Sequence, residues 1–387
     1  MNCIELFTGA GGLALGVSRA GFKHAAVVER DSDSCKTLFL NQRRGVADFA
    51  NWPIHHQDVC AFDFKRISKH IHLVAGGPPC QPFSLGGKHR GHRDERNLFP
   101  EAVRAVRELQ PEAFLFENVK GLLRDSFSKY FSYILLQLKH PLIRPKSEET
   151  WEEHLVRLEK HETGGNYADF HYNVIFSLLN AADYGVPQRR ERVFIVGIRA
   201  DLGIEWSFPE KSHSQDALLW TQSISNDYWE RHLLGRRLPF LTEKSPRIAQ
   251  LKKAGRKPAE LPWRTVRDAI SDLPDPESTS SCRVMNHSFN PGARVYPGHT
   301  GSDYDEPAKV LKAGDHGVPG GENMLSKPDG VVRYFTVRES ARLQTFPDKM
   351  VFPASWTESM RQIGNAVPVT LAETVAKQLA KILPARP

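Results

Sequence analysis

Short apolar runs recur through the first half of the chain, and each is bounded by glycine or by polar residues. Runs of this kind predict buried strands, and the stretches between them carry helical periodicity. From residue 1 to about residue 199, this alternation predicts an α/β fold with a doubly wound, mostly parallel, Rossmann-like sheet. The predicted strands are residues 3–7, 25–29, 71–75, 113–117, 173–179 and 193–198.

The pattern changes after the last of these strands. From about Arg199 to Asp329 the chain is rich in proline, glycine, serine and basic residues, which predicts a second, smaller and irregular domain. Periodicity returns near the C-terminus, where a helix is expected from Leu371 to Leu383. Its apolar face consists of Leu371, Val375, Leu379 and Leu383.

Two of the predicted strands lead into residues suited to covalent chemistry. Cys80 lies between Pro79 and Pro82 shortly after the third predicted strand, and Glu117 ends the fourth. A lone cysteine is usually a small buried hydrophobe. Open α/β sheets, however, bind their ligands at the carboxyl ends of the strands, so Cys80 and Glu117 are expected at one shared edge. A thiol held between prolines is suited to act as a nucleophile.

The first predicted strand leads into a glycine-rich loop. Gly9, Gly11 and Gly12 let the backbone turn tightly and approach a ligand. Glu29 ends the second strand, where a carboxylate can accept hydrogen bonds from ribose hydroxyls, and Asp58 is placed to bond an adenine amine. This spacing alone fits any adenosine cofactor, NAD and flavin included.

Taken in order, these blocks resemble the DNA (cytosine-5)-methyltransferase family of bacterial restriction-modification systems. The resemblance covers nearly the whole chain, and a Pro-Pro-Cys-Gln block followed by Glu-Asn-Val is highly specific. The matching blocks are Glu5 to Gly12, Glu29, Asp58, Gly76 to Ser84, Asn97 to Phe99, Glu117 to Val119, Gln188 to Arg192, Arg338 to Gln344 and Ile363 to Pro368. The resemblance implies a catalytic domain at residues 1–199 plus 354–387 and a target-recognition domain at 200–353.

The resemblance also implies the roles of the catalytic residues. Cys80 is expected to add to C6 of cytosine, which makes C5 reactive toward a methyl donor. Glu117 is expected to donate a proton or a hydrogen bond to N3 of the base, provided that burial raises its pKa. Asn118 is expected to orient Glu117. Arg192 is expected to contact the cytosine O2 edge, and Arg190 to support the nucleophile's loop or an adjacent phosphate.

The implied cofactor is S-adenosyl-L-methionine. Arg30 stands where some members carry an aromatic residue, so its guanidinium plane is expected to stack on the adenine. The residues expected to hold the cofactor are Phe7, Gly9, Gly11, Gly12, Glu29, Arg30, Asp58, Val59, Pro79, Leu98, Asn365 and Ala366.

Double-stranded DNA is the implied substrate, with the target base extruded from the helix. Residues 81–100 are expected to close over that base, and the glycine-rich stretches 297–302 and 312–321 resemble recognition loops. A basic stretch from Trp229 to Arg267 suits phosphate contacts. The residues expected to touch DNA are Gln81, Ser84, Lys88, Arg90, Arg93, Arg96, His299, Lys312 and His316. Val310-Leu311 replaces a family pair that begins with threonine, so one hydroxyl contact to phosphate is missing.

The composition agrees with a polyanionic partner, since the net charge is +7 and the sequence pI is about 9.1. The five cysteines lack any Cys-x-x-Cys spacing, so neither a disulfide framework nor a metal site is expected. The sequence shows no signal peptide and no bilayer-spanning run, which favours a cytoplasmic, nucleoid-associated protein with no membrane partner. A monomer is expected, linked to a restriction endonuclease by function rather than by contact.

Residues 141–169 form a charged insertion relative to shorter members of the family. Trp151, Leu155 and Leu158 at helical spacing predict one amphipathic helix laid on the body of the protein. A solvated surface excursion is favoured over a docking surface.

Three other functions remain open at this point. A methyltransferase acting on tRNA shares the fold, but the long basic recognition region argues against it. A catalytically silent DNA-binding regulator would not need Cys80, Glu117 and Arg192. A nicotinamide oxidoreductase would explain the glycine-rich loop but leaves Cys80 and the basic region unexplained.

Overall fold

The computed structural model describes residues 1–79, 98–164, 170–234, 245–295, 297, 300–313, 323–327 and 329–383. Its centre is a seven-stranded sheet with the strand order β3-β2-β1-β4-β5-β7-β6. The strands are β1 (Asn2–Leu6), β2 (Lys23–Glu29), β3 (Ile54–His56), β4 (Leu73–Gly76), β5 (Ala113–Val119), β6 (Tyr172–Asn180) and β7 (Glu191–Arg199). β1 to β5 pair in parallel, whereas β7 runs antiparallel to both β5 and β6.

The mostly parallel doubly wound sheet is therefore confirmed, as are all six predicted strands. β3 escaped prediction because Ile54-His55-His56 contains one apolar residue and gives no apolar run.

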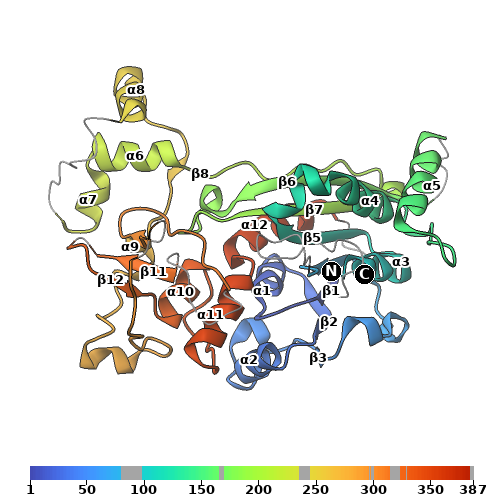
Figure 1. Cartoon of the computed structure of the whole chain (residues 1–387), viewed down its shortest axis with the longest axis horizontal. Helices are drawn as coiled ribbons and strands as arrows, with labels where there is room; N and C mark the ends of the chain where they lie inside the picture. The colour runs from blue at the N-terminus through green and yellow to red at the C-terminus, as the bar shows by residue number, and fades with distance from the viewer. Residues whose placement is uncertain are drawn as a thin grey trace.

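Helices cover both faces of the sheet (Figure 1). α1 (Gly12–Arg19) and α12 (Val369–Ala380) pack on one face, and α3 (Phe99–Leu109) and α4 (Ser128–Lys139) pack on the other. β1 alternates accordingly, with Ile4 and Leu6 in one buried cluster and Cys3 in the other.

The predicted C-terminal helix is confirmed as α12, which ends at Ala380 and not at Leu383. Its face formed by Leu371, Val375 and Leu379 is buried on the sheet, as is Leu383 beyond its end. α12 packs closely on α1, where a Cβ added at Gly16 would lie 2.4 Å from Ala372 Cβ. The end of the chain thus returns to its beginning and carries the preceding turn, residues 363–367, to the first loop.

The second half of the chain contains more helix than its sequence pattern predicted. Its elements are α6 (Gln215–Ser223), α7 (Asp227–Arg231), α8 (Pro246–Ala254), α9 (Val266–Ile270), α10 (Val337–Leu343), α11 (Trp356–Asn365), β8 (His213–Ser214), β9 (Leu261–Pro262), β10 (Ser302–Asp303), β11 (Met324–Ser326) and β12 (Val332–Tyr334). The helices are short, so few apolar positions repeat within any one of them.

This second half packs in two ways. Leu218, Tyr228, Trp229 and Trp263 form a small cluster around α6 and α7, which lie with α8 at the upper left of Figure 1. α9, α10 and α11 instead share a large buried cluster with α1 and with α2 (Ser32–Arg43). Because that cluster includes residues from both sides of position 353, the domain limits stay a prediction.

The predicted inserted helix is confirmed as α5 (Trp151–Thr163), at the far right of Figure 1. Thr150 and Glu153 form a reciprocal capping box at its start, and Leu155 and Leu158 are buried. Among the described residues, no helix has both the length and the apolar character needed to cross a membrane.

Candidate active site

The carboxyl ends of four parallel strands meet in one row. Leu6 lies opposite Val28 and Gly76, and Gly76 lies opposite Phe116. The residues that follow in each strand, Phe7, Glu29, Gly77 and Glu117, therefore share the next level of the sheet. β1 and β4 are neighbours at the centre of the sheet. The chain continues from β1 to β2 and β3 on one side and from β4 to β5 on the other, so the strand order reverses between β1 and β4. Sheets of this kind bind their ligands at the carboxyl ends of the strands next to such a switch point.

Glu117 and Arg192 form a buried ion pair at this edge. Arg192 Nε lies 2.9 Å from Glu117 Oε1, and the two side chains are 13% and 9% exposed. Arg192 lies opposite Val119 in the antiparallel pairing of β5 and β7, which lets its side chain reach diagonally to Glu117. Burial raises the pKa of the Glu117 carboxyl, and the nearby guanidinium of Arg192 opposes that rise. A raised pKa favours the protonated form of this carboxyl group.

Asn118 holds the loop that leads toward Cys80. Its Nδ2 donates to Pro78 O over 2.9 Å, and its Oδ1 accepts from the backbone N–H of Val119. The expectation that Asn118 orients the Glu117 carboxyl is corrected by these bonds, which tie β5 to the loop after β4.

The segment that carries the expected nucleophile begins and ends at this edge. Leu98 N donates to Pro79 O over 3.2 Å, so these two expected cofactor residues lie together. The chain between Pro79 and Leu98 lies outside the described residues and contains the expected nucleophile Cys80 and the expected DNA contacts Gln81, Ser84, Lys88, Arg90, Arg93 and Arg96.

Arg190 has partners other than those expected. Its side chain is fully buried, and its guanidinium donates to Leu311 O at 3.1 Å, Gly364 O at 2.5 Å and Ala366 O at 3.0 Å. The described hydrogen bonds thus go to backbone carbonyls of the second half of the chain. The expected contact with the nucleophile's loop or with a phosphate stays a prediction, because residues 80–97 lie outside the described part of the chain.

The first loop has the shape of a cofactor cradle. Phe7, Gly9 and Gly11 have φ values of 56°, 54° and 88°, in the left-handed region. Glu29 spans this loop, because its carboxylate accepts from the N–H groups of Gly9 at 2.6 Å, Arg30 at 2.8 Å and Asp31 at 2.7 Å. These three bonds fix the carboxylate and leave about one lone-pair site for a ribose hydroxyl.

Asp58 and Arg30 meet across the same edge. Arg30 Nη1 donates to Asp58 Oδ2 over 3.0 Å, and Asp58 also accepts from Cys60 N over 2.9 Å. The Cys60 N–H, aided by Arg30, lowers the pKa of Asp58 and keeps it an acceptor. Val59 is buried beside them. The Arg30 side chain is 70% exposed, so its guanidinium is free to lie over a planar ring.

The turn at residues 363–367 completes the cradle. Asn365 ends α11, and a Cβ added at Gly12 would lie 2.3 Å from Val367 O and 3.2 Å from Ala366 Cβ. Glycine at position 12 therefore lets this turn approach the first loop. Together the cradle, the fixed carboxylate of Glu29 and the acceptor Asp58 fit an adenosine cofactor.

Much of the expected DNA-reading surface lies outside the described residues, including His299 and His316. Lys312 is described, and its backbone N–H and C=O both bond the amide of Asn323 at 3.0 Å. In the basic stretch, Arg231, Arg247 and Arg267 pair with aspartates. No described ion pair involves Lys252, Lys253, Arg256 or Lys257, at and after the end of α8.

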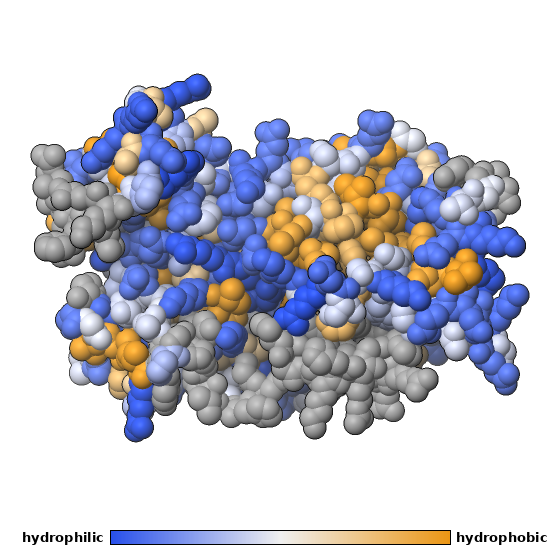
Figure 2. Space-filling view, turned by 45° about the horizontal axis from the view of Figure 1, so that its top comes forward, coloured by the Kyte–Doolittle hydropathy of each residue, from blue (hydrophilic) through white to orange (hydrophobic). Residues whose placement is uncertain are grey.

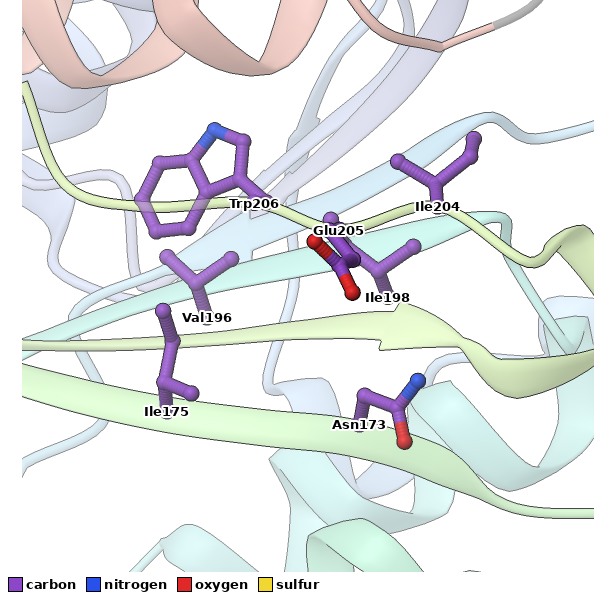
Figure 3. A pocket seen from close by; sticks show the side chains of 7 residues that line it. All are labelled: Asn173, Ile175, Val196, Ile198, Ile204, Glu205 and Trp206. Carbon is purple, nitrogen blue, oxygen red and sulfur yellow. The ribbon is translucent and has the colours of Figure 1, made fainter.

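A separate hollow of about 350 Å³ lies on the β6 and β7 face of the sheet (Figure 3). Ile175, Val196, Ile198 and Trp206 make it apolar, and it lies where Figure 2 shows hydrophobic side chains gathered. Glu205 is its one titratable lining residue, so it lacks the paired groups of the strand-end site.

His70, His72 and Glu112 gather where β4 and β5 begin, at the opposite edge of the sheet. His72 Nδ1 accepts the backbone N–H of Asn2, which places the ring proton on Nε2. That nitrogen then has no lone pair for a metal ion.

The structure also brings in residues to which the sequence assigned no role. Gln188 and Gln344 are fully buried and bond each other at 3.3 Å, next to Arg190. Both belong to blocks that carried the resemblance, but nothing in the blocks indicated which partners these amides take.

Known proteins resemble this chain over nearly its whole length. The family model described as "C-5 cytosine-specific DNA methylase" matches residues 1–141 and 165–381. The type II methyltransferase M.PspPI of Psychrobacter sp. is 31% identical over 100% of this chain and 80% of its own length. M.NgoMIV of Neisseria gonorrhoeae is 32% identical over 98% and 97%.

Solved structures share the fold. A protein described as a DNA modification methyltransferase, encoded within a prophage of E. coli, superposes with a TM-score of 0.56 at 24% identity, over 99% of both chains. The Dnmt2 methyltransferase of S. pombe gives 0.55 at 17% identity, over 99% of this chain and 98% of its own.

Proposed function

We propose, since the chain belongs to the C-5 cytosine-specific DNA methylase family, that it methylates C5 of cytosine in a specific duplex DNA sequence using S-adenosylmethionine. Its enzyme class is that of the type II DNA methyltransferases. The observation that carries the proposal is the buried Glu117–Arg192 pair, next to the Gly77–Pro78 loop that leads into Cys80. A Cβ added at Gly77 would lie only 3.3 Å from Glu117 Oε2, so the loop and the carboxyl group are neighbours.

Cys80 supplies the nucleophile in this proposal. Its thiolate adds to C6 of the target cytosine, and the electrons of the C5–C6 double bond move toward C5 and the ring. Glu117, whose pKa is raised by burial, donates a proton to N3 and neutralises the charge that develops there. Arg192 holds Glu117 in place and presents its remaining donors toward the O2 edge of the base. C5 would then take up the methyl group that the bound cofactor supplies. Transfer of the C5 proton to a base, for which a water molecule suffices, restores the C5–C6 double bond and expels Cys80 as a thiolate, and the N3 proton returns to Glu117.

The cradle residues hold the cofactor. Glu29 accepts from the ribose, Asp58 accepts from the adenine amine, and Arg30 lies over the ring while tethered to Asp58. The walls of the proposed cofactor site are formed by Phe7, Gly9, Gly11, Gly12, Val59, Pro79, Leu98, Asn365 and Ala366. When bound, S-adenosylmethionine supplies an electrophilic methyl group.

The base must leave the double helix to reach this edge, since its ring atoms are inaccessible while it is stacked. Residues 81–100 are proposed to close over the extruded base. The second half of the chain, residues 200–353, is proposed to read the sequence. Phosphate contacts suit Lys252, Lys253, Arg256 and Lys257, which take part in no described ion pair, whereas Arg231, Arg247 and Arg267 of the same stretch pair with aspartates.

The wider role is proposed by analogy with the type II relatives. The enzyme would act as a monomer in the cytoplasm, near the nucleoid, and protect host DNA from a restriction endonuclease of the same specificity. No physical complex with that nuclease is needed for this protection.

The proposal is tested by expressing the chain in cells and mapping methylated cytosines by bisulfite sequencing. We expect 5-methylcytosine at one recurring sequence, and none with Cys80→Ser. Purified protein should transfer labelled methyl groups to duplex DNA and not to tRNA. Methylation of tRNA alone would favour the tRNA-modifying alternative, and transfer to neither would contradict the proposal.

A further inference from the structure

The buried guanidinium of Arg190 sits at the end of a helix that carries a cofactor residue. α11 ends at Asn365, and the carbonyls of its last turn lack partners within the helix. Arg190 donates to two of the carbonyls at this end, Gly364 O and Ala366 O. A cation is favoured there, since the C-terminus of a helix carries partial negative charge. This explains how an arginine can be fully buried with backbone carbonyls as its described hydrogen-bond partners.

A second side chain secures the same turn from another element. Gln344, which follows α10, donates from Nε2 to Ile363 O at 2.7 Å and to Ala366 O at 3.2 Å. Its Oε1 accepts from Gln188, two residues before Arg190. The end of α11 is thus held from one side by the residue just before β7 and from the other by the residue just after α10.

The same group of side chains also fixes the base of a predicted recognition loop. Leu311 donates its N–H to Gln188 Oε1 at 3.1 Å, and its C=O accepts from Arg190. A Cβ added at Gly364 would lie 2.6 Å from Ala313 N, so the chain at 312–313 packs directly against the last turn of α11. Asn323 then bonds both backbone groups of Lys312.

We infer that Arg190 and Gln344 are positioning residues that hold the cofactor turn, Asn365–Ala366, against the base of the recognition loop. This inference rests on the proposed function, because it takes the 365–366 turn to bind the cofactor. Without these bonds the turn would sample other positions, and the observed affinity would fall with the fraction that stays competent.

The inference predicts a split between binding and turnover. Arg190→Lys keeps the charge at the helix end but loses the fork that reaches three carbonyls. We expect it to raise the Kd for S-adenosylhomocysteine about tenfold, measured by calorimetry without DNA, while kcat at saturating cofactor stays within about threefold. Arg192→Gln, two residues further along the chain, should do the reverse: an unchanged Kd and a large loss of kcat.

A matched control separates positioning from general stability. Arg338 is also buried, at 1% exposure, and donates to the carbonyls of Met285, Pro347 and Met350, away from the cofactor turn. Arg338→Lys should lower the melting temperature without changing the Kd. If the Arg190 variant fails to fold, Gln344→Met decides, since it removes the bonds from Gln344 to Ile363 O and Ala366 O without removing a charge and should also raise the Kd.

Equal binding by the wild type and a folded Arg190→Lys or Gln344→Met variant would overturn the inference. The inference would also be overturned if the Kd of Arg338→Lys rose as much as the Kd of Arg190→Lys. A wild-type protein that fails to bind S-adenosylhomocysteine would instead refute the proposed function.

Discussion

Substitution of Gly12 by alanine tests the cofactor cradle, because alanine normally stabilises a helix relative to glycine but should here disrupt the binding site. Alanine at the first position of α1 should favour the helix by up to about 1 kcal/mol. In this structure, however, the new Cβ would lie 2.3 Å from Val367 O. The carbonyl must retreat by about 0.7 Å to reach the 3.0 Å limit of real Cβ contacts. Val367 O belongs to the backbone, so the whole turn has to move with it.

The magnitude follows from overpacking, which costs about 1–3 kcal/mol in a well-packed region. Displacement of the turn moves Asn365 and Ala366 from the cradle, so this energy should appear mainly as lost affinity for the cofactor. A loss of that size corresponds to a Kd increase of about 5- to 150-fold.

The assay is calorimetric titration of Gly12→Ala with S-adenosylhomocysteine, next to urea unfolding of the same protein. Gly21→Ala is the matched control. Gly21 lies just beyond the other end of α1 with φ +97°, and an added Cβ would have nothing within 4 Å. It should lose about 1–2 kcal/mol of stability through backbone strain and bind the cofactor normally. A folded Gly12→Ala protein that binds as tightly as wild type would refute the steric account of the cradle.

Three further changes test other parts of the molecule. Glu117→Gln should lower kcat by about 10²- to 10⁴-fold at unchanged cofactor affinity. Wild-type kcat should also fall as pH rises through the raised pKa of Glu117, a limb that the variant should lack; persistence of that limb would assign it to another group. Burial lowers the pKa of His24 to about 3, so the free energy of unfolding should fall by up to about 1.36 kcal/mol per unit as pH drops below 6.5. His24→Gln should flatten that slope in urea titrations, and an unchanged slope would remove His24 as its cause. Thr150→Ala removes the capping box of α5 and should cost about 1 kcal/mol of stability with normal methyl transfer, whereas reduced transfer would give the insertion a functional part.

The sequence predicted the sheet well because its central strands β4, β5 and β7 are largely apolar runs buried on both faces. It also placed Glu117 at the carboxyl end of a strand, because the apolar run at residues 113–116 is enough to predict that position. The diagonal reach of Arg192 could not be predicted in the same way, because it depends on the antiparallel register of β5 and β7.

Arg190 shows most clearly where sequence reasoning stops. A cluster of arginines next to a reactive cysteine suggested contact with a phosphate or with the nucleophile's loop. Its described partners are carbonyls at positions 311, 364 and 366, more than a hundred residues away in the chain. Backbone acceptors of this kind have no side-chain signature. Asn118 was misassigned for the same reason, since its partner is the carbonyl of Pro78.

The central claim is that the sulfur of Cys80 bonds transiently to C6 of the target base. The most direct measurement incubates the protein and S-adenosylmethionine with a duplex whose target cytosine carries fluorine at C5, which cannot leave as a proton does. Mass spectrometry should then find the oligonucleotide attached to the peptide that contains Cys80. Complete methylation of the ordinary duplex, with no adduct on the fluorinated one, would contradict the account.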